Sequence, residues 1–82
     1  MLKVSHTFLK NIDGRAAQEI ASVAAKSKDT IYICIGDLTA NASSLLNIIR
    51  LCITAGDEAI ITVTGSSPES ELETLESFIN VI

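Results

Sequence analysis

The chain has 82 residues, a length that favours one small domain with a single core over residues 1–82. It is 48% hydrophobic, so a core can form without disulfides, and no apolar run approaches the roughly 20 residues that a membrane-spanning helix needs. The net charge is −4 with no cluster of basic and aromatic residues, which argues against nucleic-acid binding. With no visible signal peptide, we expect a cytoplasmic protein that is not inserted in a membrane and uses no cofactor.

The first third of the chain predicts a strand followed by a helix. Residues 2–8 alternate apolar and polar side chains, as in a half-buried strand, and His6 falls on its inward face as a core-edge histidine bonded to a neighbour. A loop over 10–13 leads to a helix from Gly14 to about Ser27, for which Asp13 is a suitable N-cap. The predicted apolar stripe of this helix consists of Ala16, Ile20, Val23, Ala24 and Ser27.

The middle of the chain predicts two strands and a short helix. Residues 30–35 form an apolar strand, Gly36-Asp37 suits a tight turn, and residues 38–42 alternate more weakly as a third strand. A helix of two to three turns is expected over 44–52, and a break follows at 55–57.

A fourth strand and a last helix complete the pattern. The strand covers 59–64, and the helix opens with Ser67 as N-cap and Pro68 at its first position. Its predicted buried stripe consists of Leu72, Leu75, Phe78, Ile79 and Ile82. The order β-α-β-β-α-β-α predicts an α+β fold in which a four-stranded antiparallel sheet carries three helices on one face.

The two cysteines do not predict a metal site. Cys34 and Cys52 lie far apart, each in an apolar segment, so we expect buried free thiols. Together with His6 they fall short of the roughly four ligands that a zinc site needs. No metal site is therefore predicted.

A resemblance to a known family rests first on the run Asn11-Ile12-Asp13-Gly14-Arg15-Ala16. It resembles the active loop of HPr, the histidine phosphocarrier protein of the bacterial sugar phosphotransferase system, whose pattern is Gly-Leu-His-Ser/Thr-Arg-Pro/Ala. Ile12, Arg15 and Ala16 match that pattern. Asp13 stands where the family has its phosphate-carrying histidine, Gly14 replaces Ser/Thr, and Asn11 replaces the glycine.

A second signature supports the same resemblance. The segment 44–52 is similar to the family's short middle helix in its leading serine and its apolar positions, although Ser43 replaces the usual Lys or Arg before that serine. Residues 53–56 look like the family's turn into the last strand. The resemblance runs through the whole chain in one register, and it implies the HPr-like open-faced β-sandwich. A ferredoxin-like domain for small-molecule binding or oligomerisation remains the alternative, which the short middle helix disfavours.

The resemblance implies a member of the phosphoenolpyruvate-dependent sugar phosphotransferase system. Its partners would be enzyme I, enzyme IIA domains, and HPr kinase or a transcriptional regulator, and the chain would be a monomer. Because Asp13 replaces the histidine, we expect a regulatory or protein-interaction member without histidine phosphocarrier activity, and no enzyme. The alternative is a phosphocarrier that uses another acceptor, Asp13 or Ser44.

The candidate phosphate-binding residues of the active loop are Asp13, Gly14 and Arg15. Asp13 suits a helix N-terminus as a cap, and it could also supply a fixed negative charge where the family holds its phosphate. Arg15 carries a guanidinium fork that can bind phosphate or carboxylate.

Ser44 is the candidate regulatory phosphorylation site, because HPr kinase modifies the corresponding serine in Gram-positive relatives. A phosphoserine at a helix N-terminus would be stabilised by the free amides there. The simpler interpretation is that Ser44, Ser43 or Asn41 caps the helix.

The short helix carries two apolar stripes, and a small domain cannot bury both. One consists of Leu45, Ile48, Leu51 and Cys52, and the other, about 100° away, consists of Leu46, Ile49 and Ile53. We expect the first to face the core. The second stripe, above all Leu46 and Ile49, should be exposed and dock partners.

Overall fold

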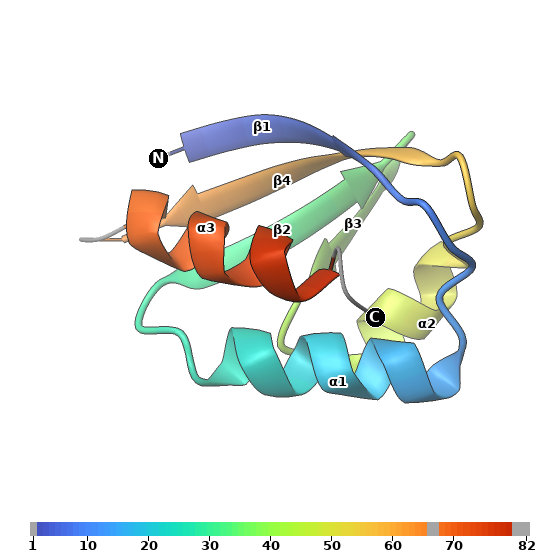
Figure 1. The fold of residues 1–82 in the computed structure, drawn as a ribbon, viewed down its shortest axis with the longest axis horizontal. Coiled ribbons are helices and arrows are strands. Elements are labelled where there is room, and N and C mark those ends of the chain that lie inside the picture. The colour runs from blue at the N-terminus through green and yellow to red at the C-terminus, as the bar shows by residue number, and fades with distance from the viewer. Residues whose placement is uncertain (1, 66–67, 80–82) are drawn as a thin grey trace.

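The computed structural model describes residues 2–65 and 68–79. The chain folds into four strands and three helices in the predicted order (Figure 1). Their bounds are β1 Leu2–Thr7, α1 Gly14–Ala25, β2 Thr30–Ile35, β3 Leu38–Asn41, α2 Leu45–Leu51, β4 Glu58–Thr64 and α3 Pro68–Ile79.

The four strands form one antiparallel sheet in the order β1-β4-β2-β3. The last strand is therefore inserted between the first two, whereas in a ferredoxin-like split βαβ domain the third strand takes that place. Figure 1 shows the helices gathered on one face of this sheet, with α3 across it and α1 and α2 below. The α+β prediction is confirmed, and the ferredoxin-like alternative is excluded by strand order.

The core lies between the sheet and the helices. Alternate residues of each strand face the helices, so the inward side chains of β1, β4 and β2 meet those of α1, α2 and α3. The largest fully buried side chains are Phe8, Ile20, Ile33, Ile48, Ile61, Leu75 and Val63. The opposite face of the sheet has no helix over it among the described residues, and Ile60 is 41% exposed there.

Helix α1 begins at its predicted cap and ends slightly early. Asp13 is the N-cap, and the C-cap is Lys26, so Ser27 lies beyond the helix, where its hydroxyl bonds with the backbone of Asp29. The residues of α1 that are buried are Ala17, Ile20, Ala21 and Ala24. Ile20 and Ala24 are buried as predicted, and half-buried Val23 packs against the core. Ala16 is only half-buried, while Ala17 and Ala21 are buried in addition, because α1 packs against both α2 and α3 and so buries a wider face than one stripe.

Helix α2 ends at Leu51, and Cys52 forms its C-cap in the left-handed conformation, with φ 51° and ψ 52°. The chain changes direction there, so the helical period does not continue. Cys52 is exposed as a free thiol, contrary to the predicted core position, and Ile53 is only 3% exposed, contrary to its predicted place on the docking stripe. The other predicted thiol, Cys34, is free and half-buried.

Replacing Cys52 with glycine is expected to stabilise the protein. The left-handed conformation is unfavourable for a residue with a Cβ, whereas glycine adopts it readily. Even after the extra entropy that glycine loses on folding, the free energy of unfolding should rise by about 0.5–1 kcal/mol. Thermal unfolding followed by circular dichroism would measure the gain as a higher Tm. Ala55→Gly, at a neighbouring residue without a positive φ, is the control and should lower the Tm.

Helix α3 packs against α1 and β4 and contributes buried side chains to the core. Leu72, Leu75 and Ile79 are buried as predicted, whereas the predictions for Ser67, the Phe78 side chain and Ile82 lie outside the described residues. Inward-facing His6 of β1 is 8% exposed, with Nδ1 3.6 Å from Glu76 Oε2 of α3. That distance makes a histidine–carboxylate pair across the core edge and is too long for a hydrogen bond.

Candidate functional site

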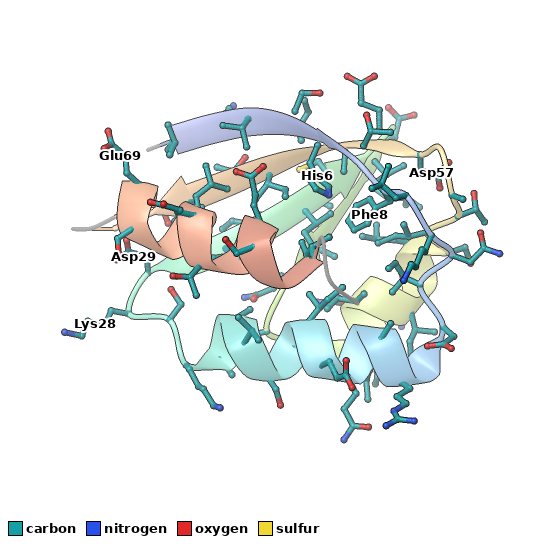
Figure 2. The ribbon with its side chains drawn as sticks, viewed as in Figure 1. His6, Phe8, Lys28, Asp29, Asp57 and Glu69 are labelled. Atoms are coloured by element: carbon teal, nitrogen blue, oxygen red, sulfur yellow. The ribbon has the colours of Figure 1, made fainter. Side chains whose placement is uncertain are left out.

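The segment before α1 lies against the segment that follows α2. Figure 2 shows Phe8 and Asp57 at this end of the molecule. The amide of Phe8 donates to the Asp57 carbonyl at 2.9 Å, and the amide of Gly56 donates to the Phe8 carbonyl at 2.8 Å. The amide of Ile12 donates to the Ile53 carbonyl at 3.0 Å. The predicted active loop is therefore bonded to the segment that follows the predicted docking helix.

Asp13 occupies the N-terminus of α1 as an exposed N-cap. Its Oδ1 accepts a hydrogen bond of 2.8 Å from the amide of Ala16, and its carbonyl accepts one of 2.9 Å from Ala17. Extended backbone angles, φ −79° and ψ −178°, aim the carboxylate at the first turn. The geometry bears out the capping prediction in full, and it leaves the carboxylate at a surface that a partner can reach.

Gly14 and Arg15 form the first turn of α1 on the surface. A Cβ added to Gly14 would meet no atom within 4 Å, so a larger residue would fit there. The Arg15 side chain is 89% exposed, and its Nε lies 3.8 Å from Glu19 Oε1 one turn on. An ion pair that long and that exposed contributes little to stability. The guanidinium of Arg15 is therefore exposed at the same end of α1 as Asp13.

Replacing Asp13 with alanine is expected to destabilise the fold by about 0.5–2 kcal/mol, because the amide of Ala16 loses its acceptor. Asp13→Asn should retain most of the stability, since the amide oxygen can accept the same bond. Urea unfolding of the three proteins would measure the difference. Equal midpoints for Asp13→Ala and the wild type would contradict the capping role.

Ser44 is the N-cap of α2, which settles the choice among the three candidate caps. Its Oγ accepts from the amide of Asn47 at 3.4 Å, and the residue is half-buried. Asn41 instead accepts from the amide and hydroxyl of Ser43, at 3.0 and 2.7 Å. Ser44 begins α2, which is about 10 Å long, whereas the Asp13 loop meets the segment after its end, so the two candidate sites lie toward opposite ends of this helix.

Two of the three predicted docking residues are exposed. Leu46 is 69% and Ile49 46% exposed, one turn apart on α2, while Ile48 and Leu51 are buried on its other side. Ile53 belongs to the core, as noted above. Asp13, Arg15, Leu46 and Ile49 are together named the recognition surface, after the role that the sequence predicts for them.

Two further features of the active loop were missed from the sequence. Leu9 is 74% exposed, and the outward alternation after β1 could have indicated it. Asn11 accepts a hydrogen bond of 2.8 Å from the amide of Ala55, 44 residues away, and no local pattern points to that bond.

No metal site or membrane span is found in the described part of the chain. Among residues 2–65 and 68–79, no group of three or more His, Cys, Asp or Glu side chains could hold a metal ion. Within the same residues, no helix has the length and apolar character needed to cross a bilayer.

A four-stranded open-faced sheet with this strand order, covered on one face by three helices in the described part of the chain, defines an open-faced α+β sandwich. The family described as the PTS HPr component phosphorylation site has a model that matches residues 8–81. The chain belongs to the HPr family. None of the curated proteins matches it.

Solved structures of HPr and of Crh share the fold. HPr-C-His of Thermoanaerobacter tengcongensis superposes with a TM-score of 0.89 at 21% identity, over 98% of this chain and 92% of that one. HPr of Bacillus anthracis str. Ames gives 0.81 at 27% identity, over 95% and 98%. Crh of Bacillus subtilis, described as a dimer with a swapped domain, gives 0.77 at 19% identity, over 98% and 92%.

Proposed function

We propose that this chain is a regulatory or protein-interaction member of the phosphoenolpyruvate-dependent sugar phosphotransferase system, without histidine phosphocarrier activity. It acts as a monomer in the cytoplasm, and it catalyses no reaction of its own. The observation that carries the proposal is Asp13 as N-cap of α1, at the position where the family's motif has its histidine.

The chemistry of Asp13 supports recognition over phosphoryl transfer. A neutral imidazole is a good nucleophile toward a phosphoryl donor, whereas a carboxylate begins as an anion and repels the incoming group. The Asp13 carboxylate is also already engaged as the cap of α1. Its fixed charge at a helix N-terminus would resemble part of a phosphorylated loop.

The partners in this proposal are enzyme I, enzyme IIA domains, and HPr kinase or a transcriptional regulator. Leu46 and Ile49 would supply exposed apolar contacts on α2, and Arg15 would supply a cation at the start of α1. Apolar and arginine side chains are enriched at protein interfaces. Ser44 at the N-cap of α2 is the proposed phosphorylation site, where a phosphate would meet unpaired helix amides.

A phosphoryl-transfer assay tests the proposal. The wild type and Asp13→His would be incubated with enzyme I and labelled phosphoenolpyruvate, with HPr of Bacillus anthracis as the positive control. We expect no label on the wild type and an acid-labile label on Asp13→His, because imidazole restores the acceptor. A labelled wild type would support the alternative carrier. Loss of that label in Asp13→Asn or Ser44→Ala would identify the acceptor.

The charge of Asp13 has its own test. The affinities of the wild type and Asp13→Asn for enzyme I and enzyme IIA would be measured by calorimetry. If the carboxylate imitates a phosphorylated loop, the two proteins should differ in affinity. Equal affinities would show that Asp13 acts only as a cap.

A further inference from the structure

The recognition surface is assembled from two segments that lie far apart in sequence. Asp13 and Arg15 belong to α1, and Leu46 and Ile49 belong to α2. The α1 end is reached through the loop after β1, and that loop is bonded to the segment after α2 rather than to α2 itself. Any shift between these two segments would change the spacing between the charged and the apolar parts of the surface.

At least four hydrogen bonds join the two segments in the described part of the chain, and one of these four uses the side chain of Asn11. Three run between backbone groups of Phe8 or Ile12 and the segment 53–57. The fourth runs from the amide of Ala55 to Asn11 Oδ1 at 2.8 Å. A substitution at Asn11 can therefore remove one of these hydrogen bonds without changing any backbone group.

The turn that contains Ala55, the residue bonded to Asn11, is stabilised by hydrogen bonds of its own. Asp57 Oδ2 accepts from the amide and hydroxyl of Thr54, at 2.9 and 3.1 Å, and so closes the turn that presents the Ala55 amide. Asn11 and Ala55 are both exposed, so their bond competes with water and adds little to global stability. The bond does, however, tie the chain two residues before the N-cap Asp13 to the turn at 54–57.

We propose that Asn11 is a positioning residue that holds the Asp13–Arg15 end of α1 in register with the docking side of α2. Asn11 stands where the family's motif has glycine, and glycine offers no side chain for this bond. The consequence for partner binding rests on the function proposed above, whereas the effect on geometry does not depend on it.

The geometric part is tested by nuclear magnetic resonance on three proteins: wild type, Asn11→Ala and Asn11→Asp. Aspartate keeps an acceptor oxygen of the same reach, and alanine removes it. We expect the Ala55 amide to exchange with solvent at least tenfold faster in Asn11→Ala and near the wild-type rate in Asn11→Asp. Residual dipolar couplings of residues 11–16 should change in the alanine variant alone. Unchanged exchange and couplings in Asn11→Ala would overturn the proposal, as would an aspartate variant that behaves like alanine.

The binding part uses enzyme I as the probe, at two salt concentrations to control for the added charge of aspartate. Asn11→Ala should bind about three- to tenfold more weakly, with an unfolding midpoint close to that of the wild type. Asn11→Asp should recover the affinity at high salt. Full affinity in Asn11→Ala, in an assay where Leu46→Asp loses binding, would refute the positioning role and leave the proposed function intact. If the wild type fails to bind enzyme I, the proposed function fails, and the resonance data still decide the role of Asn11.

Discussion

Leu46→Asp is expected to weaken the binding of enzyme I by about 30-fold or more, which is the effect of losing a buried interface anchor worth roughly 2 kcal/mol. Leu46 is 69% exposed in the free protein, so its apolar surface would leave water only in the complex. Aspartate would bring a charge into that contact and would have to be desolvated. Fold stability should change little, because most of the side chain is already in contact with water in the free protein.

The matched control for Leu46→Asp is Ile60→Asp. Ile60 is also an exposed apolar residue, at 41%, but it lies on the open face of the sheet, away from the helices. Calorimetric titration of both variants with enzyme I should therefore show a loss for Leu46→Asp alone. An equal loss in both variants would indicate a general effect of added negative charge. No loss in Leu46→Asp would remove α2 from the recognition surface.

Gly65→Ala is expected to have the largest effect on stability, a loss of about 2–4 kcal/mol. Gly65 has φ +149°, a conformation that L side chains rarely adopt. A Cβ added there would overlap the carboxylate of Asp29 and lie 2.8 Å from its Cβ. Asp29 is 6% exposed and cannot easily move aside. The Tm should fall by roughly 10–20 °C for a domain of this size.

Gly14→Ala is the control, since a Cβ at Gly14 meets nothing within 4 Å and no positive φ is needed. It should be neutral or stabilising by up to about 1 kcal/mol, because alanine favours a helix over glycine. Asp57 precedes the start of β4 and Gly65 follows its end, so the two residues lie at opposite ends of this strand. The loss of stability should therefore come without a direct effect on the recognition surface. A Gly65→Ala protein as stable as the wild type would show that Asp29 and the backbone adjust without cost.

Local patterns predicted the elements well because their signals are local. Alternation in residues 2–8 and 30–35 marks the strands, and Asp13 marks the start of α1, since a cap needs only the amides that follow it. The helical period also separated Leu46 and Ile49 from Ile48 on α2. The same period failed at Cys52 and Ile53, because it assumes that the helix continues, and the left-handed cap at Cys52 ends it.

Long-range contacts could not be predicted in the same way. The bond from Ala55 to Asn11 joins residues 44 positions apart, and no local pattern around either residue predicts this contact. Leu9 is exposed because its two neighbouring segments are bonded to the loop after α2 and leave it on the outside. Such contacts depend on which segments the fold brings together.

The α+β class, the element order and the polar groups that begin α1 could all be predicted from the amino-acid sequence. This was possible because propensity, periodicity and capping act within a few residues. The position of β4 between β1 and β2, the burial of Ile53 in the core and the bond from the Ala55 amide, beyond the end of α2, to Asn11 could be seen only in the folded structure. These outcomes depend on the packing of distant segments against each other, and burial is a property of that packing rather than of any one stretch of the chain.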